Sequence, residues 1–280
     1  MKLNLQLRCL TVISACMAVY VFSAFSPQTT LTTNNQNLVH PSELITASPY
    51  YEPLPFYTAV SFVRKSPTAF FRKPSIIIVP HHLTGAAIIA DLISAAAKFN
   101  YSQIVLIGPN HTENGSEKFW TLKANNNSES FLPPDHSLGN PKLFLNYYFV
   151  NPTIKYILIK HDATRREISA WTDQLVSAPP TDTLYIFSLD FSHYLPANTA
   201  AAKDQETLKL IFRNDLDRIL ELNNDFVDSP SGLALCLSLA KRLNTAPPQV
   251  IHHTNSGFLS GNFSSGTTSY FGMVFFPASD

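Results

Sequence analysis

The sequence predicts an α/β fold, a three-layer α/β/α sandwich around a mostly parallel sheet. Short, uninterrupted runs of β-branched and aliphatic residues are bounded by Pro or Gly, which is typical of strands that are buried on both faces. These runs alternate with helix-like stretches from about residue 51 onward. Three of the runs, at 76–80, 104–109 and 184–192, are followed at once or after one residue by a histidine.

Each element is expected from the composition of its own stretch. The apolar runs predict strands at 76–80, 104–109, 153–160 and 184–192, with closing strands at 249–253 and 267–276. Ala- and Leu-rich or amphipathic stretches predict helices at 84–98, 166–178, 198–222 and 231–243, and a helix or a turn around 138–149. Thr84 is the expected N-cap of the first of these helices, and the helix at 198–222 is expected to break near Asn214.

Composition excludes several classes of protein. The chain has 280 residues with 20 basic and 20 acidic side chains, and it has no basic cluster, so nucleic acid is not an expected partner. Cys9 and Cys16 lie in the N-terminal apolar segment, which leaves only Cys236 for the folded part. A disulfide framework and a CxxC-type zinc site are therefore excluded, and Cys236 is expected to be a core residue.

The N-terminal region predicts a membrane anchor or an export signal. Lys2 and Arg8 precede a run at 9–25 that carries no charge, which is short for a membrane span and long for a signal peptide. The Ser-, Thr- and Pro-rich stretch at 26–50 is typical of a linker, so the α/β domain is expected over 51–280. In either case the positive-inside rule places the domain outside the cytoplasm, with the membrane contacted through the N-terminal segment.

The three histidines that follow apolar runs predict a shared site. Ligands bind at the carboxyl ends of the strands in open α/β sheets, so His81, His111 and His193 are expected to converge on one pocket there. Imidazoles in such a pocket can bind a metal or transfer protons. The remaining histidines are expected to be surface or hydrogen-bonded residues, among them His82, His161, His252 and His253.

Six motifs resemble those of the Memo-like family, which is also called AmmeMemoRadiSam system protein B. They occur in the family's order: VPHHLTG (79–85), GPNH (108–111), DHSL (135–138), SLDFSHY (188–194), DSPSG (228–232) and TTSYFG (267–272). The resemblance implies the fold of the class III extradiol dioxygenases and a metal site for iron or copper that includes His81 and His111. It also implies an acid–base role for His193 with Asp190, and it adds His136 to the pocket.

The chain departs from the family pattern at the third metal ligand. By resemblance, the metal-binding cysteine of the family falls at Ser229, which is a poor ligand for a soft site. Asp228 is the neighbouring residue, and two imidazoles with one carboxylate form the facial triad that suits non-haem Fe(II). The DHSL motif also lacks the family's second acid, where this chain has Gly139.

Three functions are compatible with these residues. The first is a metal-binding domain with dioxygenase-like oxidoreductase chemistry, tethered outside the membrane and acting on a small molecule. The second is a peptide- or protein-binding module with a degenerate metal pocket. The third is a hydrolase that uses a metal-activated water on the same ligands. Fold-level analogy alone does not choose among them.

Overall fold

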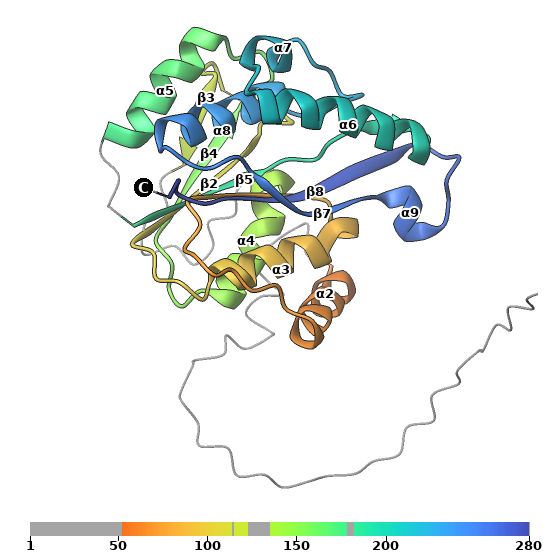
Figure 1. The fold of residues 1–280 in the computed structure, drawn as a ribbon. Helices are drawn as coiled ribbons and strands as arrows, with labels where there is room; N and C mark the ends of the chain where they lie inside the picture. The colour runs from red at the N-terminus through yellow and green to blue at the C-terminus, as the bar shows by residue number, and fades with distance from the viewer. Residues whose placement is uncertain (1–51, 114, 123–134, 178–181, 280) are drawn as a thin grey trace, which may run out of the picture. The chain divides into compact units, whose positions relative to one another are not determined.

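The computed structural model describes residues 52–113, 115–122, 135–177 and 182–279, and they form an α/β sandwich (Figure 1). Its centre is an eight-stranded sheet in the order β3-β4-β2-β5-β1-β8-β6, with β7 paired to β8. The middle of the sheet is a parallel block made of β4 (Ile154–Ile159), β2 (Gln103–Pro109), β5 (Thr183–Ser188) and β1 (Ile76–Val79). Antiparallel strands flank this block: β3 (Phe119–Leu122), β8 (Thr267–Phe275), β6 (His193–Leu195) and β7 (Gln249–Asn255).

Helices cover both faces of the sheet, which confirms the predicted three-layer architecture. Alternate residues of β1 belong to different cores: Ile77 and Val79 pack on one face, and Ile76 and Ile78 on the other. The first face is covered by α2 (Pro53–Lys65), α3 (Ala86–Ala96) and α4 (His136–Tyr148). The second is covered by α5 (Arg165–Ser177), α6 (Ala197–Arg213), α7 (Leu216–Leu220) and α8 (Pro230–Arg242).

Most predicted elements are present, and the predicted helix break occurs at Asn214. This residue has φ 52 and ψ 42, a left-handed conformation that Asn tolerates and that ends α6 before α7 begins. Sequence reasoning did not predict α2, β3, β6 or the short helix α9 (Ser256–Ser260). Cys236 is fully buried in the core, as expected.

Two boundaries were predicted wrongly, and both lie next to the functional site. The strand predicted at 184–192 ends at Ser188: Leu189 N–H still donates to Val79 O of β1, but Phe191 N–H donates to Ser269 O of β8 instead. Thr84 does not cap α3. It lies in a 3-10 turn at Leu83–Gly85, and Gly85 occupies the cap position instead.

Within the described ranges, no helix is both long enough and apolar enough to cross a bilayer. The predicted anchor or signal at 1–25 and the linker at 26–50 lie outside the described residues. The membrane attachment therefore stays a prediction from sequence.

Gly108 allows α4 to approach the end of β2 closely. A Cβ at Gly108 would lie 2.6 Å from Ser137 Oγ and 2.9 Å from Ser137 Cβ. The Ser137 hydroxyl also donates to Pro109 O at 2.8 Å, which fixes the first turn of α4 against β2. Because α4 begins at His136, this contact sets the distance between the sheet edge and the polar residues around the helix start.

We expect Gly108→Ala to reduce the free energy of unfolding by about 1–3 kcal/mol, because the new methyl group overpacks the contact with Ser137. Denaturant unfolding followed by circular dichroism measures this loss. The double variant Gly108→Ala/Ser137→Gly removes the clashing side chain and should recover part of it. A loss in Gly108→Ala of less than about 0.5 kcal/mol would contradict the close approach.

Candidate metal centre

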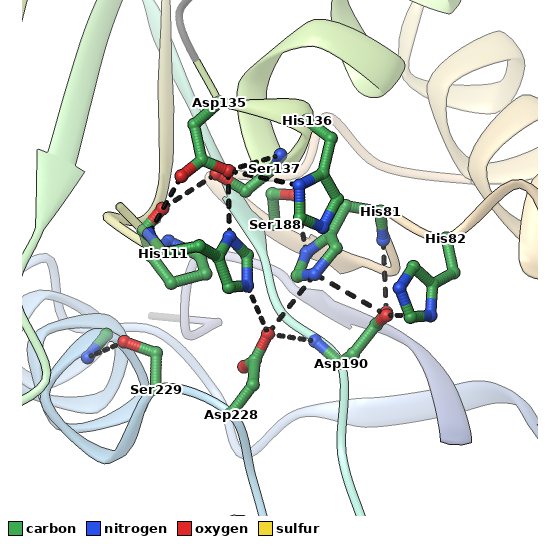
Figure 2. A network of polar contacts seen from close by, with 12 residues as sticks. His81, His82, His111, Asp135, His136, Ser137, Ser188, Asp190, Asp228 and Ser229 are labelled. Atoms are coloured by element: carbon green, nitrogen blue, oxygen red, sulfur yellow. Dashed lines mark hydrogen bonds and ion pairs between the residues drawn. The ribbon is translucent and has the colours of Figure 1, made fainter. Parts of the chain in front are cut away.

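The functional residues gather at the carboxyl edge of the parallel block (Figure 2). His81 follows β1, His111 follows β2, and Asp190 follows β5. Asp135 and His136 come from the start of α4, and Asp228 precedes the start of α8. The structure thus brings together residues from segments that are far apart in the sequence.

His81 lies at the centre of the cluster and is fully buried. Its main chain is held on both sides: its N–H donates to Asp190 Oδ1 at 3.1 Å, and Asn140 Nδ2 donates to its carbonyl at 2.8 Å. Ser188 Oγ lies 3.4 Å from its Nδ1. The other ring nitrogen, Nε2, lies 3.3 Å from Asp228 Oδ2 and 3.5 Å from Asp190 Oδ2.

Asp135 fixes the orientation of His111. Its carboxylate accepts from His111 N–H at 2.8 Å and lies 2.8 Å from His111 Nδ1, while Ser137 N–H donates to it at 2.9 Å as the cap of α4. Burial acts to raise the pKa of Asp135, but these hydrogen bonds outweigh it and hold the pKa below its usual value. With Nδ1 engaged, His111 directs Nε2 into the cluster, where it lies 3.8 Å from Asp228 Oδ2. A carboxylate behind the imidazole is typical of metal-binding histidines.

Asp190 and Asp228 carry two buried carboxylates, and the two residues are joined by hydrogen bonds from their main-chain N–H groups. Asp190 N–H donates to Asp228 Oδ2 at 3.3 Å, and Asp228 N–H donates to Asp190 O at 3.1 Å. Burial raises the pKa of Asp190 to about 7. Burial and the negative charge of Asp190 raise the pKa of Asp228 well above its usual value.

Three of the imidazoles at the site, those of His81, His136 and His193, are held neutral by burial. Burial is the main cause and the neighbouring His111 is the second. Together they lower the pKa of His81 well below 6.5 and the pKa of His136 to about 4. Burial and His82 lower the pKa of His193 to about 4, an effect that the backbone of Phe191 opposes in part. Neutral imidazoles are the form that binds a metal.

His193 and His82 lie on the outer side of the cluster. His193 begins β6, and its ring lies 6.2 Å from the ring of His82, centroid to centroid. His82 Nδ1 lies 3.2 Å from Asp190 Oδ2. The carboxylate of Asp190 therefore faces His81 and His82, and the expectation that it orients His193 stays a prediction. His82, expected to be an ordinary surface or hydrogen-bonded residue, belongs to the site.

Ser229 has a structural role at the start of α8. It is fully buried, and its hydroxyl accepts from Gly232 N–H at 3.1 Å as the helix cap. Figure 2 shows this hydroxyl directed at the helix, whereas the neighbouring Asp228 directs its carboxylate at the histidines. The chain therefore turns at this point in the way that lets the Asp228 side chain reach the histidines.

The donor atoms are close enough to hold one metal ion. His81, His111 and His136 each offer a nitrogen, and the three nitrogens lie within 4.8 Å of one another. Among the described residues, His81 Nε2, Asp190 Oδ2 and Asp228 Oδ1 are buried polar atoms without a hydrogen-bonding partner. Buried polar atoms are normally satisfied, so unsatisfied donor atoms at one place fit a cation.

Ring orientation favours Asp228 over His136 as the third ligand. The rings of His81 and His111 are 5.1 Å apart and inclined by 76°, and two imidazoles bound to one ion at near-tetrahedral angles have centroids about 5 Å apart. His136 is stacked on His111 at 4.4 Å and 19°. Lone pairs lie in the ring planes, so nearly parallel stacked rings do not converge on one ion. His136 instead forms a wall of the site.

Three other groups of polar residues lie away from this centre. Glu113, His161 and Asp162 also lie within metal-ligand distance of one another, but they are exposed. His252 pairs with Asp91 at 2.6 Å, and His253 pairs with Asp204 at 2.7 Å. His161, His252 and His253 are therefore surface or hydrogen-bonded residues, as expected.

Comparison with known proteins agrees with the motif resemblance. A family model described as Memo-like protein matches residues 121–274. A MEMO1 family protein of Methanosarcina barkeri is 28% identical over 135 residues, which cover 46% of this chain and 51% of that protein. A MEMO1 family protein of Pyrobaculum aerophilum is 22% identical over 224 residues, which cover 75% of this chain and 76% of that protein. The chain thus spans about half the length of the first relative and three quarters of the second.

We expect His193 to contribute a loss of stability to the metal-free protein as the pH falls from about 6.5 to 4. In this window the unfolded chain binds a proton at His193, whereas the folded protein, whose pKa for this residue is about 4, does not. The His193→Gln variant has no imidazole to protonate in its unfolded chain, so its free energy of unfolding should fall by about 2 kcal/mol less over the same window. Urea unfolding of both proteins at pH 7 and pH 4.5 measures the difference. Parallel pH profiles would show that His193 titrates normally.

Proposed function

The chain belongs to the Memo-like family, and we propose that it is a metal-dependent oxidoreductase of the non-haem-iron type. The ion is held by His81, His111 and Asp228. The observation that carries this proposal is the position of Asp228 Oδ2, which lies 3.3 Å and 3.8 Å from the Nε2 atoms of the two histidines. These separations suit donor atoms that each lie about 2.0–2.2 Å from one ion.

The charges of the site support a divalent ion. Burial raises the pKa of both Asp190 and Asp228 and lowers the pKa of His81 beside them, so His81 supplies no positive charge to compensate the ionised carboxylates. A cation would stabilise the ionised form of Asp228 and accept the lone pairs of His81 and His111. Two imidazoles and one carboxylate are the donor set of non-haem Fe(II) sites, and this set favours iron over copper.

The remaining residues of the site have roles that follow from their contacts. Asp135 orients His111, and the Ser188 hydroxyl contacts His81 Nδ1, the ring nitrogen that is not assigned to the metal. When bound, an Fe(II) ion with open coordination positions supplies the binding and reduction of dioxygen. His193 is neutral and only 8% exposed, so it can take a proton from a substrate that approaches from the side of His82.

The substrate and the location of the protein belong to the same proposal. A small organic molecule is the proposed substrate, and a peptide is the alternative if the metal serves only as a binding group. The charge-free run at 9–25 supports a domain that is anchored in, or exported across, a membrane.

Metal content and oxygen consumption test this function. Full-length protein without a histidine tag is reconstituted with Fe(II) under anaerobic conditions, and bound iron is measured by elemental analysis. One equivalent of iron and oxygen uptake with a suitable substrate are expected. Bound metal without oxygen uptake would favour a hydrolase with a metal-activated water, and absence of metal would favour the binding module.

We expect Asp228→Asn to lose the bound ion and Ser229→Ala to retain it. The first change removes the anionic ligand, whereas the second removes a helix cap and should reduce the free energy of unfolding by about 1 kcal/mol without affecting metal content. Elemental analysis and thermal unfolding of both variants separate the two effects. Loss of metal in Ser229→Ala, with metal retained in Asp228→Asn, would refute the assignment of the third ligand.

We expect Asp135→Asn to weaken metal binding by about 10–100-fold, because the amide cannot accept from both His111 and Ser137 as the carboxylate does. Competition with a chelator of known affinity measures the change. Asp162→Asn, at an exposed carboxylate outside the centre, is the matched control and should bind the ion as the wild type does. An unchanged affinity in Asp135→Asn would remove Asp135 from the metal centre.

A further inference from the structure

We propose that Tyr194 is a specificity-determining residue, whose ring packs against an apolar part of the substrate. The proposal rests on the proposed function, because the substrate is taken to bind at an ion held by His81, His111 and Asp228. It adds the class of substrate: a small molecule that binds the ion through a polar group and carries an apolar body next to that group.

Tyr194 lies beside the residue that is proposed to accept the proton. It follows His193, and the centroids of the two rings are 5.5 Å apart with their planes inclined by 53°. The ring of His193 is in turn 6.2 Å from the ring of His82, on the outer side of the cluster. A substrate that reaches His193 from that side therefore has the ring of Tyr194 as a neighbour.

The side chain of Tyr194 contributes little to the folded core. The residue is 78% exposed, although His193 directly before it is buried. Among the described residues, no other exposed large apolar side chain directly precedes or follows a residue of the metal centre. An apolar ring that is left in water gains free energy when a ligand covers it.

The backbone of Tyr194 has a conformation that an aromatic residue rarely adopts. Its φ is 61°, which lies in the left-handed region. The other non-glycine residues of the described chain with positive φ are Glu113 and three asparagines. Asparagine tolerates this region because its short side chain can form local hydrogen bonds, whereas a bulky ring has no such compensation. The conformation therefore costs folding free energy at this position.

Neighbouring contacts hold the conformation in place. β6 and β8 pair with a shift of register between His193 and Leu195, and Thr267 Oγ1 donates to Leu195 O at 2.9 Å. Gly266 packs so closely that a Cβ there would lie 3.2 Å from Tyr194 Cα. An irregularity of this kind can re-aim a side chain next to an active site. It explains the backbone of Tyr194 but not why the residue is a tyrosine.

Contact with a ligand explains the tyrosine. Folding alone would favour asparagine or glycine here, because both tolerate a left-handed backbone and the exposed ring buries little surface. The ring instead places an apolar surface beside the proton acceptor. The competing explanation is that the irregular backbone serves only to place His193, in which case any residue that tolerates the conformation would serve as well as tyrosine.

The binding of two carboxylates to the cobalt form tests this role. Chelator-treated full-length protein without a histidine tag is loaded with one equivalent of Co(II), and acetate or benzoate is titrated while the visible absorption of the ion is followed. Both probes offer the ion the same group, and benzoate adds an apolar ring. The wild type should bind benzoate about fivefold to tenfold more tightly than acetate, because that ring is partly removed from water against Tyr194.

Three variants separate the ring from the backbone. Tyr194→Phe keeps the ring and should keep the preference for benzoate. Tyr194→Asn suits the left-handed backbone, so it should unfold at the same temperature as the wild type or a higher one, yet it should bind the two carboxylates equally. Phe71→Asn is the matched control and should keep the preference, because Phe71 is also exposed but lies before β1, whereas the centre lies after it.

The results distinguish this inference from the proposed function. Equal affinities in the wild type, an unchanged preference in Tyr194→Asn, or a lost preference in Tyr194→Phe or Phe71→Asn overturns the role of Tyr194 and leaves the proposed function intact. A marked fall in the unfolding temperature of Tyr194→Asn would show that the residue supports the fold, and it also overturns the inference. A folded wild type that binds no Co(II), or whose bound Co(II) responds to neither carboxylate, overturns the proposed function itself.

Discussion

The burial of two neighbouring carboxylates, those of Asp190 and Asp228, is the constraint on which the site depends. An ionised carboxylate that is removed from water costs several kcal/mol unless a proton or a cation compensates it. Asp190 N–H donates to the carboxylate of Asp228 at the sheet edge, and burial lowers the pKa of His81 and His193 nearby, so these two imidazoles offer no counter-charge. The site is therefore stable with protons on its acids or with a cation between them. A cation bound here would compete with those protons, and it would also satisfy His81 Nε2, which has no hydrogen-bonding partner among the described residues.

The backbone, more than the side chains, sets the separation of these two acids. The chain leaves β5 after Ser188, and Phe191 then pairs with Val227 in an isolated bridge. The reciprocal hydrogen bonds of Asp190 and Asp228 lie beside that bridge. A metal centre built on fixed main-chain contacts needs little reorganisation when the ion binds, which favours a defined geometry.

The sequence predicted the sheet and the strand-end residues because both depend on local patterns. Apolar runs ended by Pro or Gly gave β1, β2 and β5, and hence His81 and His111 at one edge. The partner of His111 was not predictable, since Asp135 lies 24 residues away and reaches it only through the position of α4. His82 was missed because a single histidine after a strand is more often a surface or hydrogen-bonded residue, and the sequence does not reveal that its ring lies beside Asp190. The Ser-Pro pair at 229–230 carried a signal that could have been used, since Ser at the cap and Pro at the first helical position are typical of a helix start.

The serine at position 229 explains how the donor set differs from the one that family resemblance implies. A cysteine there would offer a thiolate, but Ser229 uses its only strong acceptor to cap Gly232, and a Cβ at Gly232 would lie 2.8 Å from that hydroxyl. The cap and the glycine therefore fit each other closely, and the serine cannot turn to the metal without leaving a helix N–H unpaired. Asp228 lies one residue earlier, 3.3 Å and 3.8 Å from the Nε2 atoms of the two histidines, and in the proposed site it would supply the negative charge that the thiolate would have carried. Replacing a soft sulfur donor with a hard oxygen donor weakens the preference for copper and strengthens that for Fe(II).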